Sequence, residues 1–487
     1  MGAALLMLTA AGCSSSDDDG GNGGGGTPGA GADLEGAIFA LTNRHDNSLQ
    51  LRGDGQDALP ETEAGNEIVA FARFDDGSLE LVGSFPTGGI GENIRNSGAN
   101  PLASQDPLIV SDDGAFLFAV NAGSDTVTSM AVAADMSLSV VSTVSTAGSS
   151  GMQNPVSLTQ RNGVLYVLNS GTFFDSDETT ELDFVPGTID SGGTMIPDPR
   201  RLRRASGILG FTIGADGSLT ELAGSELTQN AFTGFEGDGA NGPGNGQLAA
   251  NGGSIDFSTA GDALYITERR TNNIVTVFLD IDMLPTGSGS NFDSSTDQPF
   301  GTDVVTTVGG TEVLLVSQGN NGATGLSTLS SFTIGNDGSL APVSQSTGTE
   351  GDAFITGFTF GCWVESFTGG NNVVYAYTAN TPDGTLTGYR VDDATGALTR
   401  LETPIAGMDF PNIPATGDTG GAGVLDTEIA GGFLYQVVNV GDPGDDTNNS
   451  RIAIFQVMPG GALNALPALD VENELFVPRQ FVGVTGF

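Results

Sequence analysis

The sequence contains no lysine and only one histidine, His45, so its 15 basic residues are all arginine. Against them stand 59 acidic residues, which give a formal net charge of −44. A surface of this sign repels nucleic acid and anionic lipid, because the phosphate contacts that dominate such binding need cationic side chains. We therefore expect no nucleic-acid partner.

Cysteine is also scarce, with two residues in 487. Cys362 lies beside Trp363, the only tryptophan. A nucleophilic cysteine needs a histidine or cationic partner, and the one histidine is remote in sequence, so Cys362 is predicted to be a buried core thiol. No apolar segment approaches the ~20 residues of a membrane-spanning helix.

Glycine, in contrast, is abundant, with 75 residues, roughly twice the average usage of about 7%. Clusters of Gly, Asn, Asp and Ser recur, and no long stretch shows helical periodicity. This composition is typical of many short strands joined by turns.

One unit recurs along the chain: an apolar strand, a tight turn, a second apolar strand, a third strand with an aromatic residue, and an Asp-Gly-Ser-Leu turn into a fourth. Seven second strands can be read, ending at Asn43, Asn121, Asn169, Glu268, Gln318, Asn380 and Asn439. Repeats of ~40–50 residues with four strands each are typical of a propeller. We predict an all-β, seven-bladed β-propeller of four-stranded antiparallel blades over residues 36–487, present as a monomer.

The first copy lacks its innermost strand, because "GAIFALTN" already begins the second. The chain ends with "PRQFVGVTGF", which has first-strand character. Residues 480–486 are therefore predicted to complete the first blade, so that the C-terminal strand closes the ring and removes an open sheet edge.

The repeats resemble the seven-bladed lactonase-like propellers, a family that includes bacterial 6-phosphogluconolactonase and fungal carboxymuconate cyclase. The order of "NPLASQDPLIVS", "FAVNAGSDTV", "LYITERRTNNIVTVF" and "YAYTAN" is similar to that of secreted members. The resemblance implies the propeller fold, and it raises lactone chemistry as one possible function.

The N-terminus "LTAAGCSSSDDDGG" resembles the lipobox of bacterial lipoproteins, which are cleaved before a cysteine and acylated on it. Residues 1–12 are interpreted as a truncated signal peptide, because no basic residue precedes Cys13, and residues 13–35 as a flexible tether. The resemblance implies lipidation of Cys13 and an extracytoplasmic protein attached to the bacterial outer membrane, with Ser14 as the sorting residue. The alternative is a disordered N-terminus with a chance cysteine.

Because strands alternate in direction, the first-to-second and third-to-fourth turns lie at one end of the ring, and the other connections lie at the opposite end. The first set is uniformly short. The second set holds the extra residues, at 44–65, 170–206, 440–450, 86–105, 228–250, 285–298 and 407–424. Long loops on a rigid scaffold commonly carry binding residues, so this end is predicted to be the functional face.

Glu268 ends a second strand and is followed by Arg269 and Arg270. A lactonase needs a base, an oxyanion donor and a cation for an anionic substrate, so Glu268 and Arg270 are the catalytic candidates and Arg269 a ligand-binding candidate. A surface ion pair is the alternative. Family enzymes tend to carry an Arg-His step before the inner strand of this blade, whereas this chain has Asn251-Gly252-Gly253, which favours binding over catalysis.

Asn251 and the strand-ending Asn121, Asn169, Asn380 and Asn439 are further ligand-binding candidates. The cluster Arg200, Arg201, Arg203 and Arg204 either pairs with nearby acids or forms an anion or partner site. No cofactor or metal is predicted. The Asp-rich loops at 175–183 and 442–446 could bind Ca²⁺ through oxygen ligands but match no defined calcium loop.

Three functions remain open. The favoured one is a lipid-anchored propeller that binds a small molecule or an envelope protein through the insertion-rich face. The second is a lactone hydrolase or cycloisomerase acting on a small anionic substrate, with Glu268 central. The third is a structural envelope protein.

Overall fold

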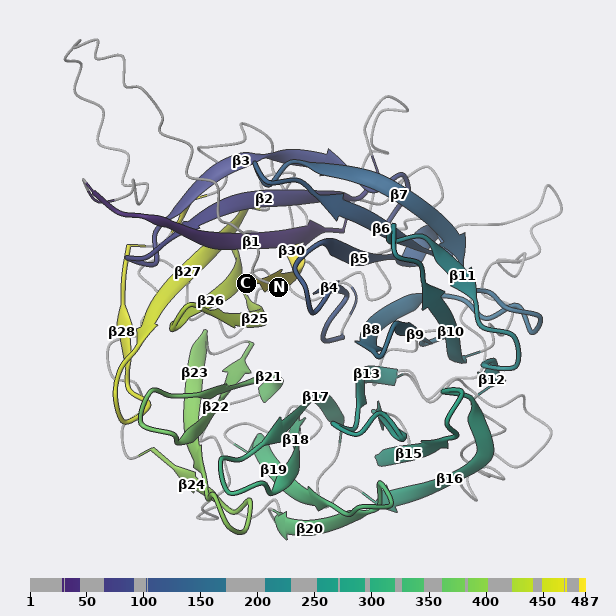
Figure 1. The fold of residues 1–487 in the computed structure, drawn as a ribbon. Helices are drawn as coiled ribbons and strands as arrows, with labels where there is room; N and C mark the ends of the chain where they lie inside the picture. The colour runs from purple at the N-terminus through teal and green to yellow at the C-terminus, as the bar shows by residue number, and fades with distance from the viewer. Residues whose placement is uncertain are drawn as a thin grey trace, which may run out of the picture.

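The computed structural model places seven antiparallel sheets around a central axis (Figure 1). It describes residues 29, 31–43, 65–91, 102, 104–171, 206–228, 252–269, 272–293, 298–319, 326–345, 361–381, 384–401, 423–440, 449–467, 469–470 and 481–487. The prediction of a seven-bladed propeller of four-stranded blades is confirmed.

Within each blade the strands run outward from the axis in chain order, except in the first blade. The inner strands, from blade 1 to blade 7, are β30 (Phe481–Gly486), β4 (Leu108–Val110), β8 (Pro155–Arg161), β13 (Gly252–Phe257), β17 (Pro299–Thr306), β21 (Gly361–Thr368) and β25 (Gly423–Ala430). The second strands are β1 (Leu34–Thr42), β5 (Phe116–Asn121), β9 (Val164–Asn169), β14 (Ala263–Glu268), β18 (Glu312–Gln318), β22 (Val374–Asn380) and β26 (Phe433–Val440).

The third strands are β2 (Glu67–Phe74), β6 (Thr126–Val132), β10 (Gly207–Ile213), β15 (Asn273–Leu279), β19 (Thr328–Ile334), β23 (Thr385–Val391) and β27 (Asn449–Val457). The outer strands are β3 (Leu79–Pro86), β7 (Leu138–Ser145), β11 (Leu219–Glu221), β16 (Pro285–Asp293), β20 (Leu340–Ser344), β24 (Leu398–Arg400) and β28 (Leu463–Ala465). The short strands β12 (Leu227–Thr228) and β29 (Leu469–Asp470) lengthen the outer edges of blades 3 and 7. The one described helix is the single 3₁₀ turn η2 (Ala122–Ser124).

One boundary differs from the sequence prediction. Residues 285–298 were expected to form a link between blades, but Pro285–Asp293 form the outer strand β16. This segment pairs with β15 through backbone hydrogen bonds, with an irregularity between Val277 and Leu279. Its sequence, PTGSGSNFD, has little apolar or β-branched content, so side-chain patterning could not reveal a strand that depends on backbone pairing.

The second strands are buried over most of their length. Every residue of β9 and β14 is buried, because the neighbouring blades cover both faces of each sheet. This explains why these segments are continuously apolar rather than alternating. Each fully buried Leu, Ile, Val or Phe side chain contributes about 1.5–3 kcal/mol relative to an exposed one, so the blade interfaces are the core of the molecule.

In blades 1, 3 and 5 an Asp-Gly-Ser turn fixes the blade against the one before it. In the turn of blade 3, Asp216 Oδ1 accepts hydrogen bonds from the Ser218 backbone N–H (3.1 Å) and hydroxyl (2.6 Å). Gly217 between them has φ +80°, and a Cβ there would lie 2.3 Å from the Phe116 ring of blade 2. Only glycine satisfies both the left-handed backbone and this close approach.

Tyrosines of the second strands reinforce the same contact. The hydroxyl of each donates to a backbone carbonyl in the third-to-fourth turn of the next blade. The pairs are Tyr166 with Met283 (2.6 Å), Tyr265 with Gly338 (2.9 Å), Tyr377 with Gly461 (3.0 Å) and Tyr435 with Gly77 (3.2 Å). Blades 3, 4, 6 and 7 thus each hold their successor in the ring through a tyrosine.

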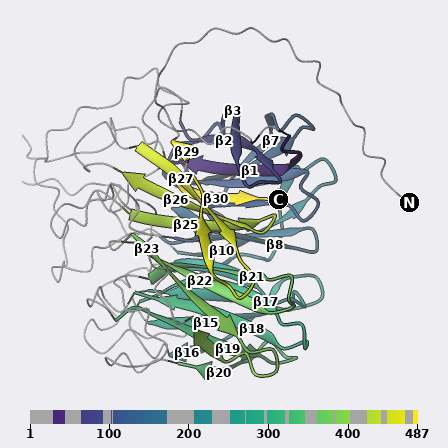
Figure 2. The same cartoon turned by 90° about the vertical axis from the view of Figure 1, so that its left-hand side faces the viewer.

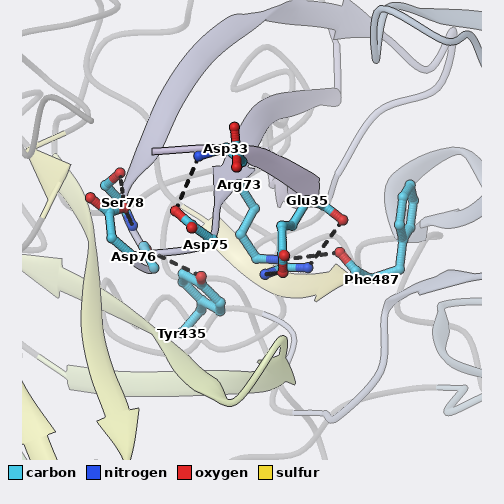
Figure 3. Close-up of polar contacts among 9 residues, drawn as sticks. Asp33, Glu35, Arg73, Asp75, Asp76, Ser78, Tyr435 and Phe487 are labelled. Atoms are coloured by element: carbon cyan, nitrogen blue, oxygen red, sulfur yellow. Dashed lines mark hydrogen bonds and ion pairs between the residues drawn. The ribbon is translucent and has the colours of Figure 1, made fainter. Parts of the chain in front are cut away.

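The ring closes where β1 pairs with β30, which confirms the predicted closure by the C-terminal strand; the two strands lie side by side (Figures 1 and 2). Arg73, only 4% exposed, lies over this seam in Figure 3. Its Nε donates to the Phe487 carbonyl (3.1 Å), and its Nη2 donates to the Glu35 carbonyl (3.3 Å). One buried guanidinium therefore joins both ends of the folded ring.

Candidate functional site

Glu268 and Arg269 lie at the end of β14, on the end of the ring where the long connections attach. Glu268 is fully buried and Arg269 is 5% exposed. The Arg269 guanidinium lies over the Phe300 ring, 5.2 Å from its centroid, and Phe300 in turn packs edge-on against Trp363 with centroids 5.1 Å apart. This arginine is thus held against an aromatic side chain of blade 5, which itself packs on Trp363 of blade 6.

The other predicted members of this site cannot be placed beside it. Arg270 and Asn251 lie outside the described residues, as do His45, the cluster Arg200–Arg204, the two Asp-rich loops and Cys13. Asn439 lies in β26, where its backbone pairs with Gly423 and Ser450. Their predicted roles stay predictions.

Asn121, Asn169 and Asn380, which end second strands, are fully buried and bind neighbouring parts of the chain. Asn121 Nδ2 donates to the hydroxyls of Thr126 (3.2 Å) and Thr128 (3.0 Å). Asn380 Nδ2 makes the equivalent bonds to Thr385 (3.2 Å) and Thr387 (3.0 Å). Asn169 Nδ2 donates to the Thr146 carbonyl (3.2 Å). In blades 2 and 6 the amide thus ties the second strand to the chain that follows, whereas in blade 3 it ties that strand to the link from blade 2.

The same end of the central channel is closed by a segment that we call the plug, residues 104–107. The Gln105 backbone N–H donates to the Gly253 carbonyl (3.0 Å). Its side-chain amide donates to the Thr302 and Val364 carbonyls (2.7 and 3.0 Å) and accepts from the Val364 N–H (3.0 Å). Gln105 is 2% exposed, so it satisfies polar groups of three inner strands that would otherwise face the axis.

The rest of the plug is held equally firmly. Trp363 Nε1 donates to the Ser104 carbonyl (2.9 Å), and the Ser104 hydroxyl donates to the Val156 carbonyl (2.7 Å). At Gly301, a Cβ would lie 2.1 Å from Gln105 Oε1. Gly301 is therefore required because the plug side chain passes directly over it.

Beyond the plug, the channel is lined by carboxylates at one shared height. In four consecutive blades, an acidic residue of the inner strand pairs with the equivalent residue of the second strand. These residues are Asp256 opposite Tyr265, Asp303 opposite Leu315, Glu365 opposite Tyr377 and Glu428 opposite Tyr435. Thr485 and Thr159 hold the corresponding positions in blades 1 and 3. Asp106 from the plug and Asp426 from β25 complete the group, which we call the channel acids.

Burial and mutual repulsion raise the pKa values of these groups. Burial, followed by the charges of Asp303 and Glu428, raises the pKa of Asp106 to about 8, and burial raises the pKa of Glu428 to about 7. Burial, together with neighbouring acids, also raises the pKa of Asp256, Glu365 and Asp426 well above the usual range. Strongly raised carboxyl pKa values are common at functional sites.

Hydrogen bonds link channel acids to the next blade around the ring. The Thr302 hydroxyl of blade 5 donates to Asp256 Oδ2 of blade 4 (2.6 Å). The Val484 N–H of blade 1 donates to Asp426 Oδ2 of blade 7 (3.1 Å). Inner strands are therefore joined by side chains where they have no backbone pairing with one another.

The sequence prediction missed the channel acids. Their signal was present, since an acidic residue interrupts otherwise small or apolar inner strands in "SIDFS", "GTDVV", "WVESF" and "VLDTEIA". It became interpretable only once the register placed these residues at one height. Among the described residues, no group of three or more His, Cys, Asp and Glu side chains is arranged to hold a metal ion.

No protein-family model matches the sequence, and no curated protein matches it. Solved structures do match. A 6-phosphogluconolactonase-like protein of Bacteroides fragilis is 16% identical, with a TM-score of 0.53 over 93% of this chain and 98% of that one. The chain has the lactonase-like β-propeller fold. A protein of unknown function from Desulfotomaculum acetoxidans gives a TM-score of 0.50 at 9% identity, over 92% of this chain and 98% of that one.

The periplasmic gluconolactonase of Pseudomonas aeruginosa is 15% identical, with a TM-score of 0.48 over 91% of this chain and 99% of that one. At these identities the likeness establishes the fold of the lactonase-like propeller and nothing of its chemistry. In the part of the chain that is described, no helix has the length and apolar character needed to cross a bilayer.

Proposed function

We propose that this lactonase-like propeller is an extracytoplasmic, lipid-anchored binding protein that has lost lactone chemistry and takes a small molecule or an envelope partner on its insertion-rich face. The burial of Glu268 carries the proposal. A general base must reach a water molecule and the substrate, yet this carboxylate is 0% exposed.

The surroundings of Glu268 support the same reading. Arg269 is held over Phe300, and the Thr267 hydroxyl donates to the Phe300 carbonyl (2.5 Å). Reaching an anionic substrate would require Arg269 to leave this aromatic contact. A binding role for the face needs no such rearrangement, because other residues of the long connections can supply the contacts.

The test separates binding from turnover. Purified protein is given a panel of lactones, including gluconolactone and 6-phosphogluconolactone, together with the corresponding sugar acids, and both hydrolysis and the thermal midpoint are measured. The proposal expects a raised midpoint for a bound compound and no hydrolysis. Hydrolysis that disappears in Glu268→Gln but persists in Glu80→Gln, a change at an exposed residue of β3, would establish the hydrolase instead.

Two further results would change the assignment. Turnover that is insensitive to Glu268→Gln would place lactone chemistry at another residue. If no compound raises the midpoint and no envelope protein cross-links to the insertion-rich face in intact cells, the protein has a structural role. The lipid anchor is tested separately by the intact mass of the membrane-extracted protein, which should carry a diacylglycerol on Cys13.

A further inference from the structure

A pocket of about 240 Å³ lies between the inner strands of blades 3, 4 and 5. Its polar lining includes Thr159, Arg161, Asp256, Thr259, Asp303 and Thr306. Arg161 ends β8 and Thr259 follows β13, so the pocket lies at the short-turn end of the ring. It is therefore separate from the insertion-rich face and from Glu268.

One hydrogen-bond donor and one hydrogen-bond acceptor of the lining residues are left without partners. Arg161 Nε and Asp303 Oδ2 are both buried, and neither has a hydrogen-bond partner among the described residues. Buried polar groups in folded proteins are nearly always satisfied, so such exceptions call for an explanation. Here an unsatisfied donor of a guanidinium and an unsatisfied acceptor of a carboxylate occur at the same cavity.

The remaining lining groups are already arranged. Asp256 Oδ2 accepts the Thr302 hydroxyl (2.6 Å), which fixes this second carboxylate beside the pocket. The hydroxyls of Thr259 and Thr306 lie 3.2 Å apart and bond to each other at the turns. The pocket thus offers one guanidinium, two carboxyl groups with raised pKa values and neutral hydroxyls. A bound ammonium would favour the ionised form of both carboxyl groups.

This combination selects against ligands of a single charge. A simple anion would suit Arg161 but would face Asp256 and Asp303, while a simple cation would suit the carboxylates but leave the guanidinium unsatisfied. A ligand that carries both charges satisfies both, because a guanidinium binds carboxylates through paired hydrogen bonds and an ammonium donates to carboxylates. The small volume limits such a ligand to a few heavy atoms.

We propose that this pocket binds a small zwitterion of the α-amino acid class, with its carboxylate on Arg161 and its ammonium on Asp303 and Asp256. The site would give the propeller a second ligand, on the face opposite the insertions.

Calorimetric titration of the unmodified protein tests the proposal without any substitution. Glycine and L-alanine are compared with acetate and propionate, which lack the ammonium, and with methylamine and ethylamine, which lack the carboxylate. We expect the zwitterions to bind at least tenfold more tightly than either set of half-ligands. Equal affinity for ethylamine and alanine, or no binding of any zwitterion, would overturn the proposal.

Substitutions then locate the site. Asp303→Asn and Arg161→Gln should each weaken zwitterion binding at least tenfold, and Arg161→Lys, which keeps the charge but loses the planar fork, should weaken it less than Arg161→Gln. Arg390→Gln, at an exposed residue of β23, is the matched control and should bind as the parent does. If every Arg161 and Asp303 variant binds the zwitterions as tightly as Arg390→Gln, the ligand lies elsewhere.

Discussion

The two ends of the central channel solve the problem of buried polarity in opposite ways. At the insertion-rich end, Gln105 fills the axis with a neutral amide whose donors and acceptor are all matched to inner strands. Toward the short-turn end, burial raises the pKa values of Asp256 and Glu428, and Asp303 Oδ2 and Arg161 Nε have no hydrogen-bond partner among the described residues. The plug stabilises the fold. The unsatisfied polar atoms toward the short-turn end destabilise it, and such local destabilisation is typical of a functional site.

Gln105→Ala removes the central side chain of the plug, and we expect it to give the largest loss of stability. The change removes three hydrogen bonds to inner strands and a long one to Asp106 Oδ2 (3.5 Å). It leaves two carbonyls and one N–H of the inner strands without their partners. We expect a loss of about 3 kcal/mol, because each unsatisfied buried group costs about 1–3 kcal/mol. Urea unfolding followed by tryptophan fluorescence measures it.

Gln160→Ala provides the matched control for this loss. The Gln160 amide donates to Asp112 Oδ1 (2.9 Å) at an exposed site, where water can replace the bond. Equal losses in the two variants would show that the plug contributes nothing special to stability.

The channel acids should make the protein more stable as the pH falls from 8 toward 5. Asp106 and Glu428 have pKa values of about 8 and 7 in the folded chain, against about 4 in the unfolded chain. Between these values the folded chain holds protons that the unfolded chain has released, so the free energy of unfolding decreases as pH rises. We expect a gain on the order of 2 kcal/mol on acidification over this range.

Asp106→Asn and Glu428→Gln isolate this contribution from general charge repulsion on an acidic protein. Each should flatten the dependence of the unfolding midpoint on pH between 5 and 8. Asp282→Asn, at an exposed turn of blade 4, should leave the slope unchanged. A slope that is the same in all four proteins would mean that the channel acids do not titrate as described.

Trp363→Phe tests the plug more gently. It removes the N–H that donates to the Ser104 carbonyl, and we expect a loss of about 1–2 kcal/mol from that carbonyl and the reduced packing. Tyr265→Phe removes a single donor from the Gly338 carbonyl at the short-turn end, where the turn lies nearer to water, and should cost less. Thermal midpoints of the two variants give the order, and a larger loss in Tyr265→Phe would contradict it.

Substitution of Glu226 should give the smallest loss of stability, with a pH dependence opposite to that of the channel acids. Although burial alone would raise its pKa, hydrogen bonds from Ser149 and Ser150 lower it to about 2. Its stabilisation is therefore present above about pH 4.3, the unfolded value, and is lost as the pH falls toward 2. Glu226→Gln should cost about 0.5 kcal/mol at neutral pH, as expected for an exposed polar contact, and nothing near pH 2. A cost that persists at pH 2 would refute the assignment.

The ring could be predicted from the sequence because its repeat is local. Each second strand is continuously apolar, and each Asp-Gly-Ser turn requires glycine for a positive φ and a close approach to the preceding blade, as Gly217 shows. These requirements place apolar runs and turn glycines at recurring positions in the sequence. The outer strand β16 has no such sequence pattern, since its sequence is rich in Gly and Ser and its pairing is made by backbone groups.

The site was harder to predict because it depends on register across several hundred residues. Glu268 was singled out since it replaces asparagine at a strand end, yet its burial is decided by neighbours from other blades. Gln105 reaches residues 197 and 259 positions away, and nothing in "ASQDPL" shows which strands it meets. The channel acids likewise became a group only when the inner strands were aligned.

The pairing of β1 with β30 also bears on how the chain reaches this structure. Arg73 and Phe487 are 414 residues apart, and non-local contacts of this kind form late because the entropy of closing the loop opposes them. During synthesis, six blades can assemble in order while blade 1 still lacks its inner strand. The edge of β1 is then exposed and able to pair with another chain. The pairing of β30 with β1 therefore removes an opportunity for one molecule to join its sheet to another.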